Sequence, residues 1–433
     1  MTVARPAPAV RRWPRLSRTR TLGVFYVLLG VVLVTRVAPA LSDEPRRFLF
    51  GTGSDGVSWS FDPPTVTVVI GLALVVFGVA TFAEHRLGSF VRGGLVLGGV
   101  LGVLMILVAS MALSPTKSTN LVPLFVQSLK LGSPIALGAL AGLWSERSGV
   151  VNIGIEGMML AGAGIGFVGY ALMNGGSGGL PLYVAVLIAV LAGGLFAALH
   201  AVMSISFRTD QVVSGVAVNL LAIGLTSFLR TQVLVPLNAD SATTLPEISL
   251  PVLSRIPIIG DQLFVAKPIF FATFVLFGVS AFVLARTRWG LRVRSVGENP
   301  HAAEALGVDV IRIRYQAVIL GGLIAGLAGA QFSLETVGSF DDLMTNGTGF
   351  IALAALIFGK WRPGSVLAAS MFFGFARALG VRIQLLNVEI SGFPLPSQFL
   401  QAVPYLVTLI VLAGAIGRAI PPGAVGRPYR RPR

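Results

Sequence analysis

Long apolar runs, separated by short polar stretches, are the dominant pattern along this 433-residue chain. Most of them approach the about 20 residues that a helix needs to cross a bilayer, and none shows the alternation of a membrane barrel strand. They lie at 22–34, 65–83, 95–113, 121–143, 150–173, 180–203, 211–229, 267–285, 315–334, 349–359, 364–379 and 399–419. The pattern therefore predicts an all-α, polytopic bundle of about twelve transmembrane helices.

Two stretches of glycine-rich backbone lie at comparable points in the two halves of the chain, at 150–159 and 345–360. The second stretch enters the pair of runs at 349–359 and 364–379, which are too short to cross fully. Paired interruptions of this kind are typical of inverted repeats, whose broken helices surround a central binding site. Glycine pairs four residues apart inside other runs indicate close helix packing instead.

The composition excludes a soluble enzyme. Hydrophobic residues make up 54% of the chain and charged residues 12%, whereas a soluble domain carries about a quarter charged residues. No polar stretch is long enough to bury a core of its own, so we expect the segment 230–266 to be at most a small external cap. A bacterial cytoplasmic membrane is the expected location.

The formal charge of +15 gathers at the termini and in particular loops. Basic residues on one side of a membrane mark the cytoplasmic face. This rule places 84–93, 144–149, 204–210, 286–314, 360–362 and both termini inside. The charge therefore reflects topology, and we expect no nucleic-acid partner. The first run also allows a cleaved signal peptide, because residues 38–40 resemble a cleavage site, although we expect a retained helix.

The chain lacks the residue patterns that metal binding, nucleotide hydrolysis and other hydrolytic reactions require. The chain has no cysteine, and its three histidines lie far apart, so we expect no metal and no cofactor. It also has no phosphate-binding loop and no hydrolase motif. We therefore expect a non-catalytic protein that relies on a partner for any ATP hydrolysis.

Asn152 and Glu156 lie in the first interrupted stretch, between apolar segments. Polar groups are costly in lipid, so we expect these two to face a protein interior or a water-filled path. A hydrogen bond between helices that only fixes their packing is the alternative.

The basic loop at 286–314 contains a helix signal. Asn299 can cap a helix, Pro300 suits its first position, and Gly307 can end it. A short helix flanked by arginines favours a docking surface over a loop that only sets topology.

Three blocks carry a resemblance: SERSGVVNIGIEG at 145–157, RVRSVGENPHAAEALG at 292–307 and GFIALAALIFGKWRPG at 349–364. Together they resemble the permease subunits of bacterial ABC importers, in the ribose-type, simple-sugar and nucleoside family, and the first block favours the nucleoside branch. The resemblance covers residues 95–420. We accordingly expect a basic arm at 1–20, an extension with two apolar segments at 21–94, a permease domain with a ten-helix core at 95–420 and a basic tail at 421–433.

The resemblance implies partners. A second permease subunit would form a heterodimer with this chain, and an extracytoplasmic substrate-binding lipoprotein would deliver a nucleoside. ATP-binding subunits would dock on the short cytoplasmic helix, whose matching residues are Glu298, Asn299, Pro300, Ala303, Glu304 and Gly307. Alternating access, driven by those subunits, would carry the substrate across.

The substrate pathway calls for hydrogen-bonding groups and aromatic surfaces. Candidates to line it are Asn152, Glu156, Asn219, Gln331, Phe332 and Phe350. Ordinary packing is the alternative for each phenylalanine. A sugar or branched-chain amino-acid permease is an alternative function, and so is a self-sufficient secondary transporter in which Lys130, Glu156 and Glu335 couple to ions. The short cytoplasmic helix distinguishes these classes, because a lone transporter does not need it.

Overall fold

The computed structural model describes residues 17–51, 57–113, 118–173, 179–237, 244–385, 389–390, 393–394 and 419–430. Within these ranges, ten helices are long and apolar enough to cross a membrane. The predicted all-α, polytopic bundle is confirmed. The predicted run at 399–419 lies outside the described ranges, except for its last residue.

The long helices are α1 (Arg18–Val32), α2 (Pro63–Ala80), α3 (Glu84–Ala112), α4 (Leu121–Arg147), α5 (Ile155–Leu172), α6 (Gly179–Ala201), α7 (Gln211–Leu229), α9 (Pro268–Arg286), α12 (Val310–Ala330) and α14 (Pro363–Leu385). Wide helical turns at 33–37, 202–206, 230–234 and 331–337 extend four of them. The shorter helices are α8 (Gly260–Leu263), α10 (Arg288–Glu298), α11 (Pro300–Ala305) and α13 (Thr348–Phe358).

Strands are short and few. A three-stranded sheet has the order β2-β1-β3, formed by β2 (Val57–Phe61), β1 (Arg46–Phe50) and β3 (Ser118–Asn120). β1 is antiparallel to β2 and parallel to β3. The described residues also form two small antiparallel pairs: β4 (Ile248–Ser249) with β5 (Val265–Ala266), and β6 (Glu389–Ile390) with β7 (Phe393–Pro394).

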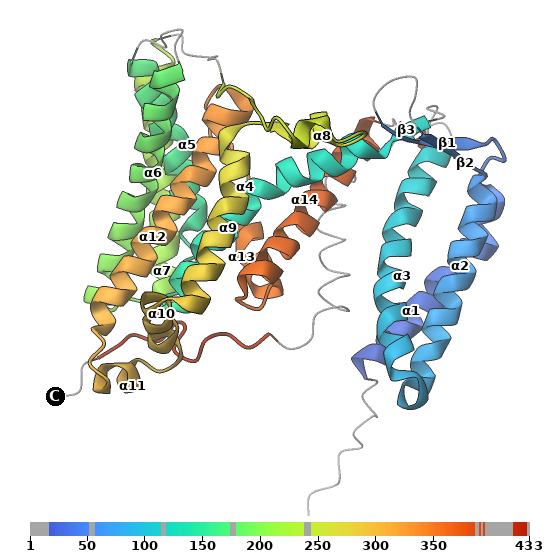
Figure 1. Cartoon of the computed structure of the whole chain (residues 1–433), viewed down its shortest axis with the longest axis horizontal. Helices are drawn as coiled ribbons and strands as arrows, with labels where there is room; N and C mark the ends of the chain where they lie inside the picture. Colours follow the sequence, from blue (N-terminus) through green and yellow to red (C-terminus); the bar gives the residue numbers. More distant parts are fainter. Residues whose placement is uncertain are drawn as a thin grey trace, which may run out of the picture.

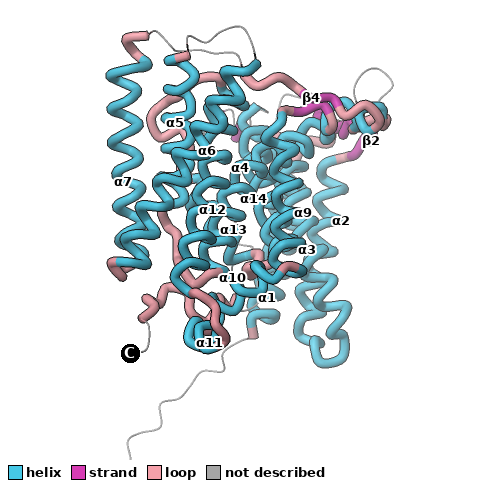
Figure 2. Tube along the Cα trace, turned by 60° about the vertical axis from the view of Figure 1, so that its left-hand side comes forward, coloured by secondary structure: helices cyan, strands magenta, loops and turns pink. Residues whose placement is uncertain are grey.

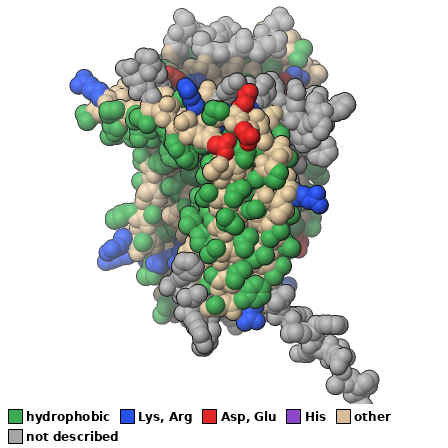
Figure 3. All heavy atoms as spheres, turned by 90° about the vertical axis from the view of Figure 1, so that its right-hand side faces the viewer, with side chains coloured by type: hydrophobic (Ala, Val, Ile, Leu, Met, Phe, Trp, Pro, Cys, Tyr) green, Lys and Arg blue, Asp and Glu red, His purple; other side chains and the backbone are tan. Residues whose placement is uncertain are grey.

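The helices α1, α2 and α3 form a unit beside the main bundle (Figure 1). α1 and α2 approach closely at glycines, since a Cβ on Gly71 would lie 2.9 Å from the Gly30 carbonyl oxygen. The prediction of a loop at 84–93 is wrong, because these residues form the first part of α3. The segment contains no proline, so the helix can continue through it. α3 therefore joins the residues on both sides of the predicted boundary between 94 and 95. On the side of the molecule where α1, α2 and α3 lie, hydrophobic side chains largely cover the described surface (Figure 3).

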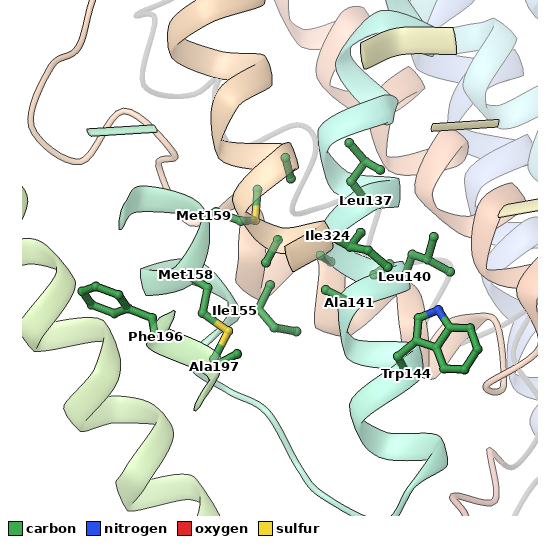
Figure 4. Packing of buried hydrophobic residues seen from close by; sticks show 14 of the residues in the cluster. Leu137, Leu140, Ala141, Trp144, Ile155, Met158, Met159, Phe196, Ala197 and Ile324 are labelled. Carbon is green, nitrogen blue, oxygen red and sulfur yellow. The ribbon is translucent and has the colours of Figure 1, made fainter. Parts of the chain in front are cut away.

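The main bundle is packed around α4, α5 and α12. Leu137 and Leu140 of α4, Met159 of α5 and Ile324 of α12 belong to one buried cluster (Figure 4). Glycines let the backbones of α5 and α12 meet, because a Cβ on Gly162 would lie 2.6 Å from the Gly326 carbonyl oxygen. The packing role predicted for such glycine pairs is confirmed here.

The two runs predicted to be short differ. α13 has 11 residues, too few to cross a bilayer. α14 has 23 residues and is long enough, so the prediction of a second incomplete helix is wrong. The predicted run ends at 379 because the charged Arg382 follows, but α14 continues through it. Arg377 and Arg382, both in α14, donate to Thr348 and Thr119, respectively.

The two ends of the molecule differ in their elements. One end, here called the α11 end, carries α10, α11 and residues 419–430 (Figure 1). The strands lie toward the opposite end, here called the α8 end (Figure 2). Several loops predicted to lie inside meet at the α11 end. Arg147, for example, donates to the Trp361 carbonyl, and a Cβ on Gly297 would lie 2.1 Å from the Arg147 carbonyl oxygen.

Candidate functional site

A cavity of about 250 Å³ opens beside α4, α9, α14 and the wide turn at 331–337. Glu247, Ala266 and Lys267 contribute the remaining wall, and the first two belong to the segment 230–266 that was predicted as an external cap. The lining residues are Lys130, Leu131, Pro134, Glu247, Ala266, Lys267, Phe270, Gln331, Phe332, Glu335, Thr336 and Arg377. Three cations and two carboxylates thus share one cavity with two phenylalanines.

Glu335 is the buried carboxylate of this cavity, and it caps a helix from another part of the chain. Its Oε2 accepts the Ile269 N–H at 2.6 Å, and its Oε1 accepts the Phe270 N–H at 3.1 Å. These donors are in the first turn of α9, where backbone N–H groups lack partners within the helix. A carboxylate there is also favoured by the helix dipole. Glu335 therefore fixes the start of α9 against the wall of the cavity.

Gln331 ties the same wall to α4. Its Nε2 donates to Ser133 Oγ at 2.5 Å and to Glu335 Oε1 at 3.2 Å. Gln331 is one of the predicted pathway residues, and it lines the cavity. Its placement and that of Glu335 follow from the wide turn that continues α12 past Ala330.

Lys267 is the cation immediately before α9. Its ammonium donates to Thr244 Oγ1 at 2.7 Å and to the Glu335 carbonyl oxygen. Burial lowers the pKa of Lys267 from its usual value, while the nearby Glu335 and Glu247 carboxylates act to raise it and Lys130 to lower it. The cavity therefore offers charged donors and acceptors close together, which suits a ligand with several hydroxyl or amide groups.

Arg377 connects the cavity to the broken helix α13. Its Nη1 donates to Thr348 Oγ1, at the first residue of α13, at 3.0 Å. The other side of this helix start is held by Glu156. The two interrupted stretches that the sequence singled out therefore meet in space, close to the cavity.

Glu156 accepts three hydrogen bonds from the residues that lead into α13. Its Oε1 accepts from Thr345 Oγ1 at 2.6 Å and from the Gly347 N–H at 2.8 Å. Its Oε2 accepts the Gly349 N–H at 2.5 Å. Gly347 has a φ of +73°, which only glycine adopts easily. Glu156 thus caps α13 from α5, as Glu335 caps α9.

Asn152 and Asn219 lie away from the cavity and hold the stretch before α5. Asn219 accepts the Gly157 N–H at 2.8 Å and donates to the Ile153 carbonyl at 3.1 Å. Asn152 is fully buried, and its amide donates to Ser145 Oγ at 3.4 Å. Among the predicted pathway residues, Gln331 and Phe332 line the cavity, and Phe350 is 49% exposed on α13.

The cavity also contains residues that the candidate pathway set missed. The sequence indicates Lys130 and Glu335 only as ion-coupling groups of the alternative transporter, and it does not single out Lys267 or Arg377. A charge inside or next to an apolar run is the sequence feature that could have identified them. Their convergence depends on how α4, α9 and α14 pack together.

The predicted short helix at the α11 end is confirmed. The Asn299 side chain accepts the Ala302 N–H at 3.1 Å, and Pro300 is the first residue of α11. Gly307 follows with a φ of +80°, after Leu306. Ala303 is the buried residue of this six-residue helix, so most of α11 faces outward.

A joint connects α10, α4 and α13 at this end. Gly297 of α10 packs directly on the backbone at Arg147, the last residue of α4. The Arg147 guanidinium donates to the Trp361 carbonyl, and Trp361 Nε1 donates to Glu146 Oε2 at 2.6 Å. Trp361 follows the end of α13, so this short helix is held at both ends.

Comparison with known proteins gives consistent matches. Residues 124–412 match the family described as the branched-chain amino acid transport system permease component. The chain is 39% identical over 309 residues to the guanosine ABC transporter permease protein NupQ of Bacillus subtilis, covering 70% of this chain and 94% of that protein. It is 39% identical over 300 residues to the nucleoside ABC transporter permease protein NupC of Lactococcus lactis, covering 69% and 93%. It is 34% identical over 308 residues to the putative glucose ABC transporter permease protein TsgC13 of Haloferax volcanii, covering 67% and 91%.

Proposed function

The chain belongs to this family of ABC transporter permeases, and from that premise we propose that it carries nucleosides across the cytoplasmic membrane through the cavity beside α4. Two of its relatives are named as guanosine and nucleoside permeases, and the chain covers nearly their whole length. The permease itself is a transport component without catalytic chemistry. Its partners are then ATP-binding subunits, a second permease subunit and an extracytoplasmic substrate-binding lipoprotein.

The cavity is the observation that carries this proposal. A nucleoside presents ribose hydroxyls, which both donate and accept hydrogen bonds, and a flat base that stacks on apolar surfaces. Lys130 can donate to it, Glu335 and Glu247 have oxygen lone pairs to accept from it, and Phe270 forms part of the apolar wall. A hexose offers that wall only the C–H face of its ring, whereas a base offers a larger flat surface.

The joint at the α11 end supports ATP-driven movement. The ATP-binding subunits would dock on α11, and displacement of α10 would reach Arg147 through its contact with Gly297. From there the contact with Trp361 leads along α13 to Glu156 and, through Thr348 and Arg377, to the cavity. In this proposal the α11 end and both termini lie in the cytoplasm.

Purification and uptake test the proposal together. Tagged chain is extracted in mild detergent, its co-purifying proteins are identified by mass spectrometry, and ATP turnover is measured. Cells that express the complex are then given radiolabelled guanosine, with unlabelled glucose or branched-chain amino acids as competitors. We expect an ATP-binding subunit, a second permease and uptake that only nucleosides inhibit. A chain that purifies alone, or uptake inhibited by glucose, would contradict the proposal.

Replacing Asn299 and Glu304 together by alanine tests the docking helix. The amount of folded permease in the membrane should stay the same, because both side chains lie at the outward-facing helix α11. Guanosine uptake should fall to background, because the cap of α11 and its carboxylate are lost. Normal uptake by this variant would remove α11 from the coupling route.

A further inference from the structure

Residues 419–430, here called the C-terminal strap, lie along the α11 end of the molecule (Figure 1). The sequence predicted only a basic cytoplasmic tail for most of this segment. In the structure, the strap contacts α10, α11, α12 and the junction between α4 and α5. A segment that only sets topology has no need for so many contacts.

The first contacts are with the end of α10. The Ala424 N–H donates to the Gly297 carbonyl at 2.8 Å, and the Gly423 N–H donates to Glu298 Oε2 at 3.2 Å. The last carbonyls of a helix lack partners within the helix, and the strap supplies one. Since α11 begins two residues after Glu298, these bonds fix the point from which α11 departs.

The second contacts are with α12 and α11. Arg314 of α12 is 1% exposed, and its Nη1 donates to the Arg427 carbonyl at 3.2 Å. The Arg314 guanidinium carbon lies 6.0 Å from the centre of the Tyr429 ring, within cation–π range. The Tyr429 ring centre also lies 5.2 Å from that of His301 in α11. Tyr429, which is 7% exposed, therefore lies between α12 and α11.

The third contacts reach the stretch before α5. A Cβ on Gly149 would lie 3.3 Å from the Ala424 carbonyl oxygen, and one on Gly426 would lie 3.6 Å from the Val151 side chain. Both glycines have positive φ, at +91° and +76°, so neither turn readily accepts another residue. The strap thus touches the stretch that leads directly to Glu156.

These contacts matter because α11 cannot hold its own position. It has six residues and one buried side chain, Ala303, and helices this short are marginal without external packing. A docking helix transmits force only if it is fixed to the elements that must move. The strap joins it to α12 by Tyr429 and to the α4–α5 junction by Ala424 and Gly426.

We propose that the C-terminal strap transmits ATPase-driven movement of α11 to the α4–α5 junction, with Tyr429 as its positioning residue. The proposal rests on the function proposed above, because it presupposes that α11 receives the ATP-binding subunits. Tyr429 touches no substrate in this role. It keeps α11 aligned with α12 while the strap backbone carries the displacement toward Glu156.

The test uses the complete complex, reconstituted in vesicles, and measures guanosine transported for each ATP hydrolysed. Tyr429→Ala should leave ATP hydrolysis and subunit composition unchanged while this ratio falls by about tenfold, the size of a typical coupling between sites. Tyr429→Phe keeps the ring and should restore the ratio. Arg427→Ala is the matched control, because it removes an exposed side chain and keeps the carbonyl that Arg314 uses.

A second variant guards against simple misfolding. His301→Ala removes the ring from the α11 side at an exposed position, and it should lower the ratio by a smaller factor than Tyr429→Ala does. An unchanged ratio in both variants would overturn the proposal. Loss of the ATP-binding subunit from the Tyr429→Ala complex would also overturn it, because the strap would then serve docking alone.

The proposal of a nucleoside substrate can fail independently of the proposal for the strap. It is contradicted if the unmodified complex hydrolyses ATP but does not transport guanosine. The coupling ratio is then measured with radiolabelled glucose, and the same variants decide the role of the strap.

Discussion

Glu156 and Glu335 do the same structural job in two different places. Each carboxylate accepts N–H groups at the start of a helix that belongs to another part of the chain: Glu156 for α13 and Glu335 for α9. The helices differ in length, since α13 has 11 residues and α9 has 19. The sites differ too, because Glu335 lines the cavity and Glu156 does not.

The difference indicates two roles: Glu156 is an anchor that holds α13 in place, whereas Glu335 belongs to a working surface, the wall of the cavity. α9 is long enough to span the bilayer, so it keeps its place by packing even if its cap is disturbed. α13 is too short for that and depends on the bonds at its two ends. Glu156 should therefore govern where α13 lies, whereas Glu335 combines capping with a position in contact with the cavity.

The largest effect should come from Glu156→Ala. It leaves three donors without their acceptor, namely Thr345 Oγ1 and the N–H groups of Gly347 and Gly349, at about 1–3 kcal/mol for each buried unsatisfied group. We expect less folded protein in the membrane, a lower Tm in detergent and no uptake. Glu156→Gln keeps one acceptor oxygen and should be less severe. A Tm equal to that of the unmodified chain would show that α13 does not need this cap.

Glu335→Ala should have the next largest effect. It frees two backbone donors, those of Ile269 and Phe270, and water from the cavity can reach this position. The Tm should fall less than in Glu156→Ala, while guanosine uptake should still be lost because the cavity wall changes. The control is Glu247→Ala, an exposed lining residue, which should leave Tm unchanged. A Tm loss equal to that of Glu156→Ala would remove the distinction between anchor and working surface.

Gly349→Ala sharpens the comparison by adding one methyl group to the Glu156 site. The new Cβ would lie 2.6 Å from the Glu156 backbone nitrogen, and overpacking of this kind costs about 1–3 kcal/mol. Tm and uptake should both fall, with Glu156 itself intact. Gly364→Ala is the matched control, since a Cβ there meets nothing within 4 Å. Equal Tm values for the two variants would show that α13 can shift away from α5 without loss.

Local chemistry explains what the sequence could predict. The apolar runs determine the helices because their length matches a bilayer, and Asn299 with Pro300 determines α11 because a cap acts on its own neighbours. The meeting of Glu156 with Thr345 bridges 189 positions in sequence, and no local pattern encodes such a distance. The sequence singled out both stretches, but their contact follows from tertiary packing.

The cavity and the strap were harder to predict for different physical reasons. The cavity collects charges from α4, from α14, from the residue before α9, from the wide turn at 331–337 and from the segment before β4. In the sequence, the charges of α4 and α14 are each only a polar interruption in an apolar run. The strap has no helical or strand period, since it binds through backbone groups at Gly423, Ala424 and Arg427 and through one ring, Tyr429. Its prolines and arginines are equally typical of a free tail.

The smallest effect should come from Phe350→Ala. This variant tests whether the outward face of α13 meets lipid or the substrate pathway. Phe350 was a candidate pathway residue, yet it is 49% exposed and does not line the cavity. Removing an exposed side chain changes stability by about 0.5 kcal/mol or less, so Tm should stay within error. If this face of α13 meets lipid, uptake should also be unchanged, as for the exposed Phe228→Ala on α7. If it meets the pathway formed with the second permease, guanosine KM should rise at unchanged Tm, and the short helix that Glu156 anchors would then present substrate contacts on the side away from the cavity.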